Sequence, residues 1–279
     1  MIPAARGDRP AIEAFLKRHI ATSMFPLSNL RQHGMAGGHP RAMKVWVRWE
    51  AGQITDVLSI SEEGMIFPQC PTGPWGEAAV ALAGQTAIGI LGQAGQVAAL
   101  RRFLRLPERA GLDTEEPLYE LALANMAVPD CTGFTLRPLG DGPRDLIIGW
   151  RHDYLKEVLP MPGEDTSQKA EDDVEQYLAA DTHRVLFQGN RPVAMTGFNA
   201  ALPEAVQIGG VYTPPRMRSR GLARRAVALH LQEARDKGAD HAILFAASPQ
   251  ACKAYEAIGF VRSGDYTILA YENPQVIHG

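Results

Sequence analysis

The stretch VQIGGVYTPPRMRSRGLA, residues 206–223, decides how the sequence is interpreted. Its first residues are mostly apolar and predict a buried strand, and Pro214 and Pro215 must end the pairing of that strand because proline has no amide hydrogen to donate. A strand that parts from its neighbour leaves backbone N–H groups at its edge, which an extended ligand can use. A turn rich in arginine and glycine then leads into an expected helix over Gly221–Lys237.

The start of this helix is suited to bind an anion. Its first N–H groups lack intrahelical partners and the helix dipole is positive there, while Gly221 and Ala223 leave room for a pyrophosphate to approach. Helical spacing cannot direct every nearby arginine at one ligand, so the alternative interpretation is a solvated basic face or a small nucleic-acid patch. The arginines concerned are Arg216, Arg218, Arg220, Arg224 and Arg225.

Two motifs resemble those of the GNAT superfamily of N-acetyltransferases. RSRGLA at residues 218–223 matches the family signature Arg/Gln-x-x-Gly-x-Gly/Ala, between a strand and a helix as the family requires. SPQACKAYEAIGF at residues 248–260 matches a second family element and follows an expected strand, Ala242–Ala246. The resemblance covers residues 132–279 and implies an acyltransferase that uses acetyl-CoA as its co-substrate.

The resemblance also implies a role for each matching position. The Val211 backbone N–H would polarise the thioester carbonyl, Thr213 would help to hold the pantetheine arm like an added strand, and the Tyr255 hydroxyl would give a proton to the departing thiolate. The alternative for Tyr255 is a ring packed in the core with its hydroxyl at the surface. The implied cofactor contacts are Val211, Tyr212, Thr213, Arg218, Ser219, Arg220, Gly221, Leu222, Ala223, Arg224 and Ser248.

The sequence departs from the family pattern at the position of the general base and at one cofactor contact. Gln207 stands where some members have a catalytic carboxylate, and its amide cannot accept a proton, so the identity of the base is open. Glu204, just before the same strand, is a candidate base acting through a water; the alternative is an exposed turn residue without a role. Ser248 stands where relatives often carry asparagine, and its hydroxyl can still donate, with shorter reach.

Turn-forming residues cluster at residues 129–133, between two apolar stretches. We therefore predict two domains, residues 1–130 and residues 131–279. Helical and strand patterns alternate in both halves, so the expected class is α/β. In the terms of the resemblance, the chain would hold two GNAT-like domains, each a mixed, mostly antiparallel twisted sheet flanked by helices.

The first half carries a weak echo of the second, which favours duplication of one fold. The matching stretches are Gly89–Gly95 with Ala242–Ser248 and Tyr119–Leu123 with Tyr266–Ala270. In this alignment the turn Gly92–Gly95 carries no arginine cluster, and Arg102 stands at the position of Tyr255. We expect the first half to be a degenerate, non-catalytic domain and residues 131–279 to be the catalytic one.

Composition limits the class of partner. Of 279 residues, 46% are hydrophobic and 21% are charged, as in globular proteins, and a net charge of −3 argues against a nucleic-acid partner. We expect no metal, because the cysteines are scattered and three histidines lack a second ligand at metal spacing. These residues are Cys70, Cys131, Cys252, His183, His230 and His241. A leader pattern and a bilayer-spanning apolar run are both missing, so a cytoplasmic protein without membrane partner is expected.

The predicted reaction is transfer of an acetyl group from acetyl-CoA to a primary amine by direct attack, without a covalent enzyme intermediate. One alternative is a non-catalytic acyl-CoA-binding sensor or interaction module. Another is an aminoacyl transferase of the tandem GNAT type, which would favour a more basic surface. The sequence leaves the acceptor open among polyamines, amino acids, aminoglycosides and protein amines, and we expect a monomer or a homodimer.

Overall fold

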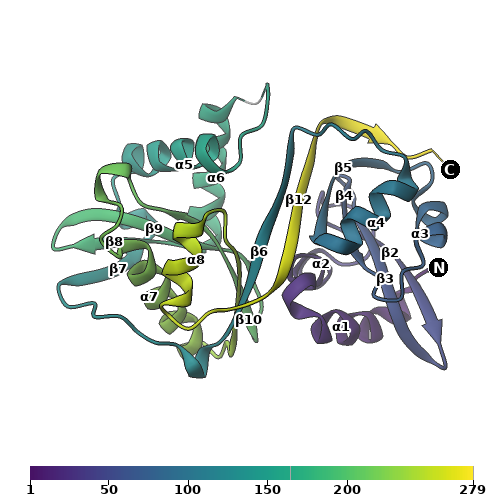
Figure 1. Ribbon diagram of the computed structural model, residues 1–279, viewed down its shortest axis with the longest axis horizontal. Helices are drawn as coiled ribbons and strands as arrows, with labels where there is room; N and C mark the ends of the chain where they lie inside the picture. Colours follow the sequence, from purple (N-terminus) through teal and green to yellow (C-terminus); the bar gives the residue numbers. More distant parts are fainter. Residues whose placement is uncertain (164, 279) are drawn as a thin grey trace. The chain divides into compact units, whose positions relative to one another are not determined.

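A computed structural model describes residues 1–163 and 165–278 of the protein. Helices and strands alternate along the chain (Figure 1), and the strands pair mostly antiparallel, so the expected α/β class is confirmed. In the part of the chain that the structure describes, no helix is both long and apolar enough to cross a bilayer.

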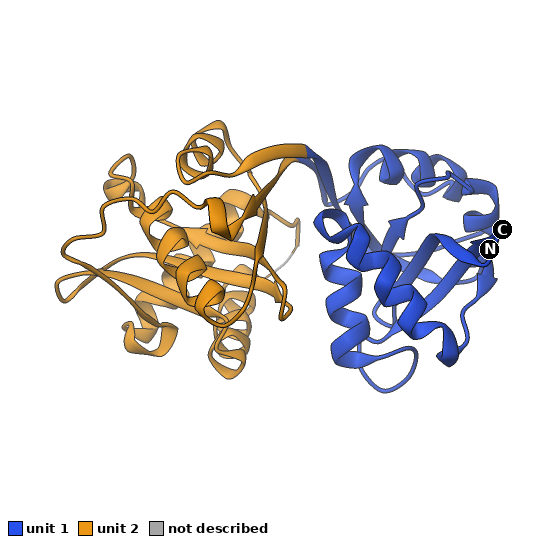
Figure 2. Cartoon of the chain, turned by 90° about the horizontal axis from the view of Figure 1, so that it is seen from below, with its two compact units in different colours: residues 1–116, 264–279 blue, residues 117–263 orange. Residues whose placement is uncertain are grey.

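The chain forms two compact units (Figure 2). Unit 1 contains residues 1–116 and 264–279, and unit 2 contains residues 117–263. The chain passes from one unit to the other twice, within β6 (Leu112–Ala122) and within β12 (Val261–Val276). In space, the division therefore falls inside two strands and differs from a single division at residue 130.

Unit 1 is built on a sheet with the strand order β1-β2-β3-β4-β5-β12. Leu58 and Ile60 of β3 point to one face of this sheet, where they pack with Leu82 of α3 and Leu100 of α4. The elements of unit 1 are β1 (Ile2–Pro3), α1 (Arg9–Arg18), α2 (Ile20–His33), β2 (Met43–Glu50), β3 (Gln53–Ser61), β4 (Met65–Gln69), α3 (Trp75–Leu82), β5 (Thr86–Gln93) and α4 (Ala94–Leu104), with parts of β6 and β12.

Unit 2 is built on a sheet with the strand order β6-β11-β10-β9-β8-β7. Alternate residues of β8 face opposite sides: Val185 packs with Trp150 of α5, and Leu186 packs with Ala226 of α7. Helices α5 and α6 therefore cover one face, and α7 and α8 cover the other. The elements of unit 2 are β7 (Phe134–Pro138), α5 (Arg144–Val158), α6 (Thr166–Ala180), β8 (His183–Gln188), β9 (Arg191–Ala201), β10 (Ala205–Tyr212), α7 (Leu222–Asp236), β11 (His241–Phe245) and α8 (Pro249–Glu256), with parts of β6 and β12.

Each half of the sequence ends in a strand that completes the sheet of the other half. In unit 1, β12 pairs antiparallel with β5, with Leu269 opposite Ile90. In unit 2, β6 pairs antiparallel with β11, with Glu120 opposite Ile243. The stretches that echo each other in the sequence thus occupy equivalent places in the two sheets, and the two units share one strand arrangement.

Candidate active site

Strand β10 separates from β11 part of the way along its length. The parallel register of the two strands ends where Ile208 lies opposite Leu244. Toward β9 the register shifts over residues 209–212, and Gly210 has a φ of 60°. A bulge of this kind bends a strand and re-aims the backbone groups that follow it. Val211 therefore lies in a bulged segment beyond the last β11 pair, as an extended ligand at this edge requires.

The turn after β10 reverses the chain through two residues with positive φ. Ser219 has a φ of 63° and Gly221 a φ of 68°, just before α7 begins at Leu222. A Cβ atom on Gly221 would lie 2.8 Å from Arg224 Nε and 3.0 Å from Arg225 Nη1. Position 221 therefore favours glycine for its backbone conformation, and a Cβ atom there would displace the flexible ends of two arginine side chains.

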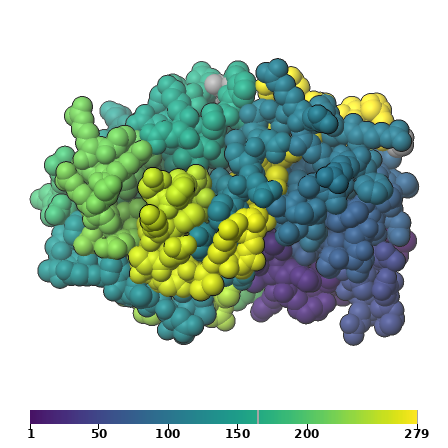
Figure 3. Space-filling view, in the orientation of Figure 1, coloured from purple at the N-terminus to yellow at the C-terminus, as the bar shows by residue number. Residues whose placement is uncertain are grey.

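Among the described residues, no side chain caps the amino-terminal end of α7. Gly221 offers no side chain to the first N–H groups, and the first turn contains no acidic residue. The turn before it is mostly exposed, and together with α7 it gives the light green surface on the left of Figure 3. An uncapped, exposed helix start with a positive dipole is suited to bind an anion.

Arg218 holds the turn together. Its Nε donates to the carbonyl oxygen of Thr213 at 2.9 Å, and its Nη2 lies 2.6 Å from Glu157 Oε2 on α5. The guanidinium carbon also lies 5.7 Å from the centre of the Tyr212 ring. These contacts give Arg218 a structural task in fixing the loop, and its predicted contact to a diphosphate stays a prediction.

Arg225 and Arg220 bind backbone carbonyl groups as well. Arg225 donates from Nε to the oxygen of Asp130 at 2.7 Å and from Nη1 to that of Arg220 at 2.9 Å. Arg220 Nη2 lies 3.4 Å from the oxygen of Arg216. Part of the arginine cluster therefore stabilises the turn itself.

A pocket of about 240 Å³ lies beside Arg220 and Arg225. It is lined by Phe134, Gln188, Arg191, Val193, Met217, Arg220, Leu222 and Arg225.

Two polar atoms at opposite ends of the turn are buried without a hydrogen-bond partner among residues 1–163 and 165–278. They are Thr213 Oγ1, where β10 ends, and Arg224 Nε, in the first turn of α7. Buried polar atoms are usually satisfied, so a water or a ligand is a suitable partner for these two. A hydroxyl beside the strand edge and a guanidinium at the helix start fit the pantetheine and diphosphate of acetyl-CoA.

Tyr255 and Ser248 lie on α8 and at its start. The Tyr255 ring is 7% exposed and packs edge-on against Phe260, with 6.0 Å between ring centres. The ring is therefore part of the core, and the catalytic role of its hydroxyl stays a prediction. Ser248 Oγ accepts the N–H of Ala251 at 3.2 Å and so caps α8. Its hydroxyl hydrogen can still be donated to a ligand.

The structure favours neither Gln207 on β10 nor the candidate base Glu204, just before this strand, as the general base. Gln207 is fully buried, and its Nε2 donates to the carbonyl oxygen of Ile208 at 2.8 Å. Glu204 directly precedes β10 and so lies at its amino-terminal end, whereas Val211 lies near its carboxyl-terminal end. Because a strand rises about 3.3 Å per residue, Glu204 lies about 23 Å along the strand from Val211, too far to act through one water. A base that serves an acyl group held at Val211 must come from elsewhere.

A carboxylate that the sequence reading missed lies near the end of β10. The Tyr212 hydroxyl donates to Asp153 Oδ2 on α5 at 3.1 Å, and burial together with the charge of Asp153 raises the pKa of Tyr212 to about 12. The Asp153 side chain is 53% exposed, and its Oδ1 lies 3.6 Å from His152 Nδ1. The only signal in the sequence is the helical spacing of Asp153 and Glu157, which places both on one face of α5.

Unit 1 has a turn at the equivalent place, but its polar groups are already paired. Strand β4 runs parallel to β5, and residues 70–74 connect it to α3. The Cys70 N–H donates to Gln96 Oε1 at 2.6 Å. The buried carboxylate of Asp56 accepts the Thr72 N–H at 2.9 Å and the Thr72 hydroxyl at 2.6 Å.

This position corrects the expected location of the degenerate turn. The sequence echo assigned it to Gly92–Gly95, but these residues lead from β5 into α4 and correspond to the start of α8 in unit 2. The counterpart of the turn before α7 is residues 70–74, because both follow the strand that pairs parallel with the next one. Residues 70–74 have the sequence CPTGP, so this turn also contains no arginine.

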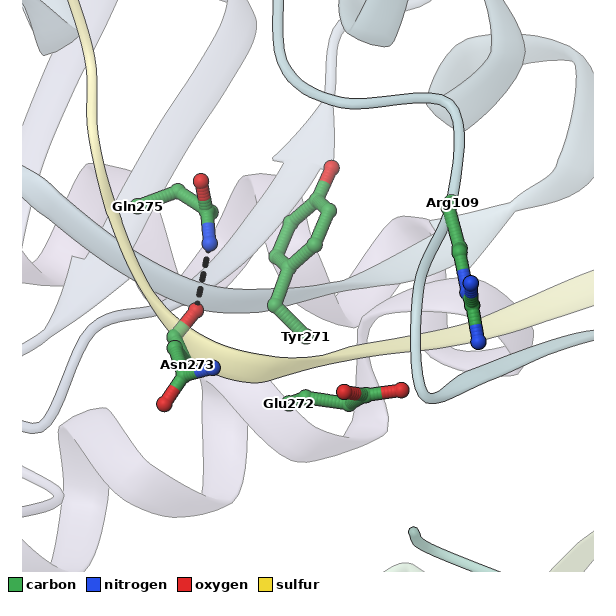
Figure 4. A pocket seen from close by; sticks show the side chains of 5 residues that line it. All are labelled: Arg109, Tyr271, Glu272, Asn273 and Gln275. Carbon is green, nitrogen blue, oxygen red and sulfur yellow. Dashed lines mark hydrogen bonds between the residues drawn. The ribbon is translucent and has the colours of Figure 1, made fainter.

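A cavity of about 290 Å³ in unit 1 lies at the register shift of β12 (Figure 4). Gln275 Nε2 donates to the carbonyl oxygen of Asn273 at 2.7 Å, and the Arg109 and Glu272 side chains lie along the same opening. This cavity contains none of the residues expected for the site. Across the described part of the chain, no three His, Cys, Asp or Glu side chains are grouped to hold a metal ion.

Comparisons with known proteins bear on the family and the fold of the chain. Residues 149–260 match the model of the acetyltransferase (GNAT) family. A solved Drosophila protein is 13% identical, covers 97% of this chain and 98% of its own, and has a TM-score of 0.63. A GCN5-related N-acetyltransferase from Sphaerobacter thermophilus is 14% identical, covers 100% and 95%, and has a TM-score of 0.55.

A third structure is a tandem GNAT protein from the clavulanic acid biosynthesis pathway. It is 13% identical, covers 98% of both chains and has a TM-score of 0.52. No protein with a curated description matches the chain. At these identities the structural likenesses establish the fold alone, and they extend over both units. The protein therefore carries a GNAT-family acetyltransferase domain at residues 149–260, and both of its units have the GNAT fold.

Proposed function

We propose that unit 2 transfers the acetyl group of acetyl-CoA to a primary amine by direct attack. The observation that carries this proposal is the pair of buried polar atoms, Thr213 Oγ1 and Arg224 Nε, on either side of the start of α7. Among the described residues neither atom has a hydrogen-bond partner. One atom fits an arm laid along a strand edge, and the other fits a diphosphate. The family match at residues 149–260 supports the same co-substrate.

The residues proposed to bind the co-substrate follow the turn. Val211 to Thr213 would offer the edge of β10 to the pantetheine arm, and residues 218–224 would surround the diphosphate at the start of α7. Ser248 would donate its hydroxyl to the arm. Acetyl-CoA supplies an activated thioester as the acyl donor.

Three groups of this chain would carry the chemistry. The Val211 N–H would stabilise negative charge on the thioester oxygen, and Tyr255 would give a proton to the leaving thiolate. An alkyl ammonium with a pKa of about 10.4 loses its proton at a cost of about 4 to 5 kcal/mol near neutral pH. Asp153, exposed beside Tyr212, is placed to hold this ammonium or to accept its proton.

The domain division and the assembly state belong to the same proposal. We propose that residues 131–279 of the sequence contain the catalytic machinery and residues 1–130 contain none. The protein would work in the cytoplasm as a monomer or a homodimer, without nucleic acid. A net charge of −3 favours a small amine acceptor over aminoacyl-tRNA, whose phosphates would require a basic surface.

The test is a thiol-release assay with acetyl-CoA and a library of amines. For Tyr255→Phe we expect kcat on the best amine to fall about a hundredfold, as loss of a general acid does, with acetyl-CoA affinity nearly unchanged. Tyr271→Phe removes a buried tyrosine hydroxyl in unit 1 and should leave kcat unchanged. Acetyl-CoA binding without turnover on any amine would support the acyl-CoA sensor instead.

A further inference from the structure

His183 is the first residue of β8, and its ring is buried inside unit 2. The residue is 1% exposed, and its imidazole stacks on the Tyr177 ring of α6, with 3.5 Å between ring centres and 12° between planes. Its Nδ1 lies 2.9 Å from the Thr182 hydroxyl. Its Nε2 is buried and has no hydrogen-bond partner within the described ranges 1–163 and 165–278.

The other side of the ring lies against the backbone of two neighbouring strands. A Cβ atom on Gly197 of β9 would lie 2.1 Å from the His183 ring, and one on Gly210 of β10 would lie 2.8 Å from Nε2. Contacts this short do not occur, so the ring occupies the space that side chains would take at both positions. Gly210 is the residue of the β10 bulge with a φ of 60°.

The ring can occupy this place because it is uncharged. Burial, and then the charges of Arg151 and Arg184, lower the pKa of His183 to about 3. A neutral imidazole avoids the cost of a buried, unpaired charge. Because Nε2 is sealed from solvent, a substrate proton cannot reach it, and the ring acts through its shape.

We propose that His183 is a positioning residue for acetyl transfer: its ring, backed by Tyr177, holds the Gly209–Gly210 bulge and thereby aims the Val211 N–H at the thioester carbonyl. The proposal rests on the proposed function of unit 2. A bulged strand has lost regular ladder bonds and needs other contacts to keep one geometry. Small misplacements of a catalytic donor reduce turnover more than they reduce binding.

The experiment compares His183→Ala, His183→Phe and Phe187→Ala. The alanine removes the ring, and the phenylalanine restores a flat ring without nitrogen atoms. Phe187 is a buried ring on the same strand and the same face, four positions away, so its truncation serves as the control for lost packing. For each variant we would measure kcat and KM for acetyl-CoA, and the amide ¹H–¹⁵N shifts of Gly210 and Val211.

For His183→Ala we expect kcat to fall about tenfold or more, KM for acetyl-CoA to stay within about threefold, and both amide signals to move. His183→Phe should recover most of kcat and the wild-type shifts, and Phe187→Ala should keep both. Wild-type kcat and shifts in His183→Ala would overturn the proposal, as would an equal loss of kcat in Phe187→Ala. So would a His183→Phe variant with native shifts and the low kcat of the alanine variant.

Two further readouts keep the outcomes distinct. If His183→Ala does not fold, Tyr177→Leu removes the stacking partner while leaving the imidazole, and the same reduction of kcat with unchanged KM is expected. If the wild type shows no turnover on any amine, the proposed function fails. The amide shifts then still decide whether the ring holds the bulge.

Discussion

The turn at residues 213–221 in unit 2 and the turn at residues 70–74 in unit 1 follow the same element of one fold and differ in how their polar groups are satisfied. Both connect a strand of a parallel pair to a helix, and both contain a glycine with positive φ, Gly221 and Gly73. In unit 2 the turn is long and basic. In unit 1 it is short, and a carboxylate of the protein lies within it.

Asp56 supplies unit 1 with an internal anion. Its side chain is fully buried on β3, and it accepts the backbone N–H and the hydroxyl of Thr72. In the equivalent region of unit 2, Thr213 Oγ1 and Arg224 Nε have no hydrogen-bond partner among the described residues, and we propose that they contact a ligand. We propose that one unit keeps its turn open to an external anion, whereas in the other the carboxylate of Asp56 already occupies the turn.

The largest expected effect is on acetyl-CoA affinity and distinguishes Gly221 of unit 2 from Gly73 of unit 1. Gly221→Ala should weaken acetyl-CoA binding about a hundredfold, because several charge-assisted hydrogen bonds depend on a turn that a methyl group would strain. Gly73→Ala is the matched control: its φ is 72° and a Cβ there would lie 3.1 Å from Trp75 Nε1. Titration calorimetry should show the affinity loss only for Gly221→Ala, with one site per chain in the wild type. Equal losses in both variants would contradict the comparison.

The next effect concerns the anion inside unit 1. Asp56→Ala removes hydrogen bonds from a carboxylate and leaves the Thr72 N–H without its partner, so we expect the free energy of unfolding to fall by about 3 kcal/mol. Urea denaturation measures this change. Inorganic phosphate should restore part of the lost stability in the variant, beyond the stabilisation that it gives the wild type by binding at the start of α7.

The matched control for this change is Asp113→Ala in unit 1. Asp113 forms an exposed ion pair with Arg101, and such pairs contribute about 1 kcal/mol or less. Acetyl-CoA affinity should be unchanged in both aspartate variants. A gain of a second acetyl-CoA site in Asp56→Ala would mean that the short turn still has the full binding geometry, and it would weaken the contrast.

A smaller effect concerns how the stability of unit 2 depends on pH. The pKa of His183 in unit 2 is about 3 in the folded state and 6.5 without the fold, because burial, Arg151 and Arg184 oppose its charge. Stability from the neutral ring is present above pH 6.5 and is lost as the pH falls toward 3. From pH 7 to pH 5 the loss is about 2 kcal/mol. Burial also holds the pKa of His230 well below its usual range, so its share of the pH dependence remains in every variant. His183→Phe should reduce the loss of stability between pH 7 and pH 5 in urea unfolding by about 2 kcal/mol, and an unchanged slope would contradict the assignment to His183.

Sequence reasoning recovered the elements but not their partners. The strand Ala242–Ala246 and the helix Gly221–Lys237 agree with β11 and α7 to within a few residues, because apolar periodicity and turn residues define them locally. The course of β12 into unit 1 was missed, since an apolar strand pattern does not encode which neighbour it pairs with. Register and strand order depend on the whole sheet.

The turn of the candidate site in unit 2 could be predicted because local sequence features define it. The double proline and the glycine at 221 fix the turn locally. The tasks of the arginines depend on distant residues: Arg218 meets Glu157 and Arg225 meets Asp130. Asp56 gave no signal, because its partner Thr72 is sixteen residues away across a strand connection.

The last effect tests which arginine contacts the ligand. Arg224 occupies the third position of α7, and the equivalent position of α3 is Glu77, whose negative charge suits a helix start. An arginine there is unfavourable for the helix alone and becomes favourable only beside an anion. Arg224→Ala should therefore weaken acetyl-CoA binding about tenfold, with little change in the free energy of unfolding, which calorimetry and urea denaturation measure separately. Arg235→Ala, exposed in the last turn of the same helix, is the matched control and should change neither. If Arg224→Ala binds acetyl-CoA as tightly as the wild type, the unpaired Nε in unit 2 does not bind the diphosphate, and the contrast with unit 1 reduces to turn length.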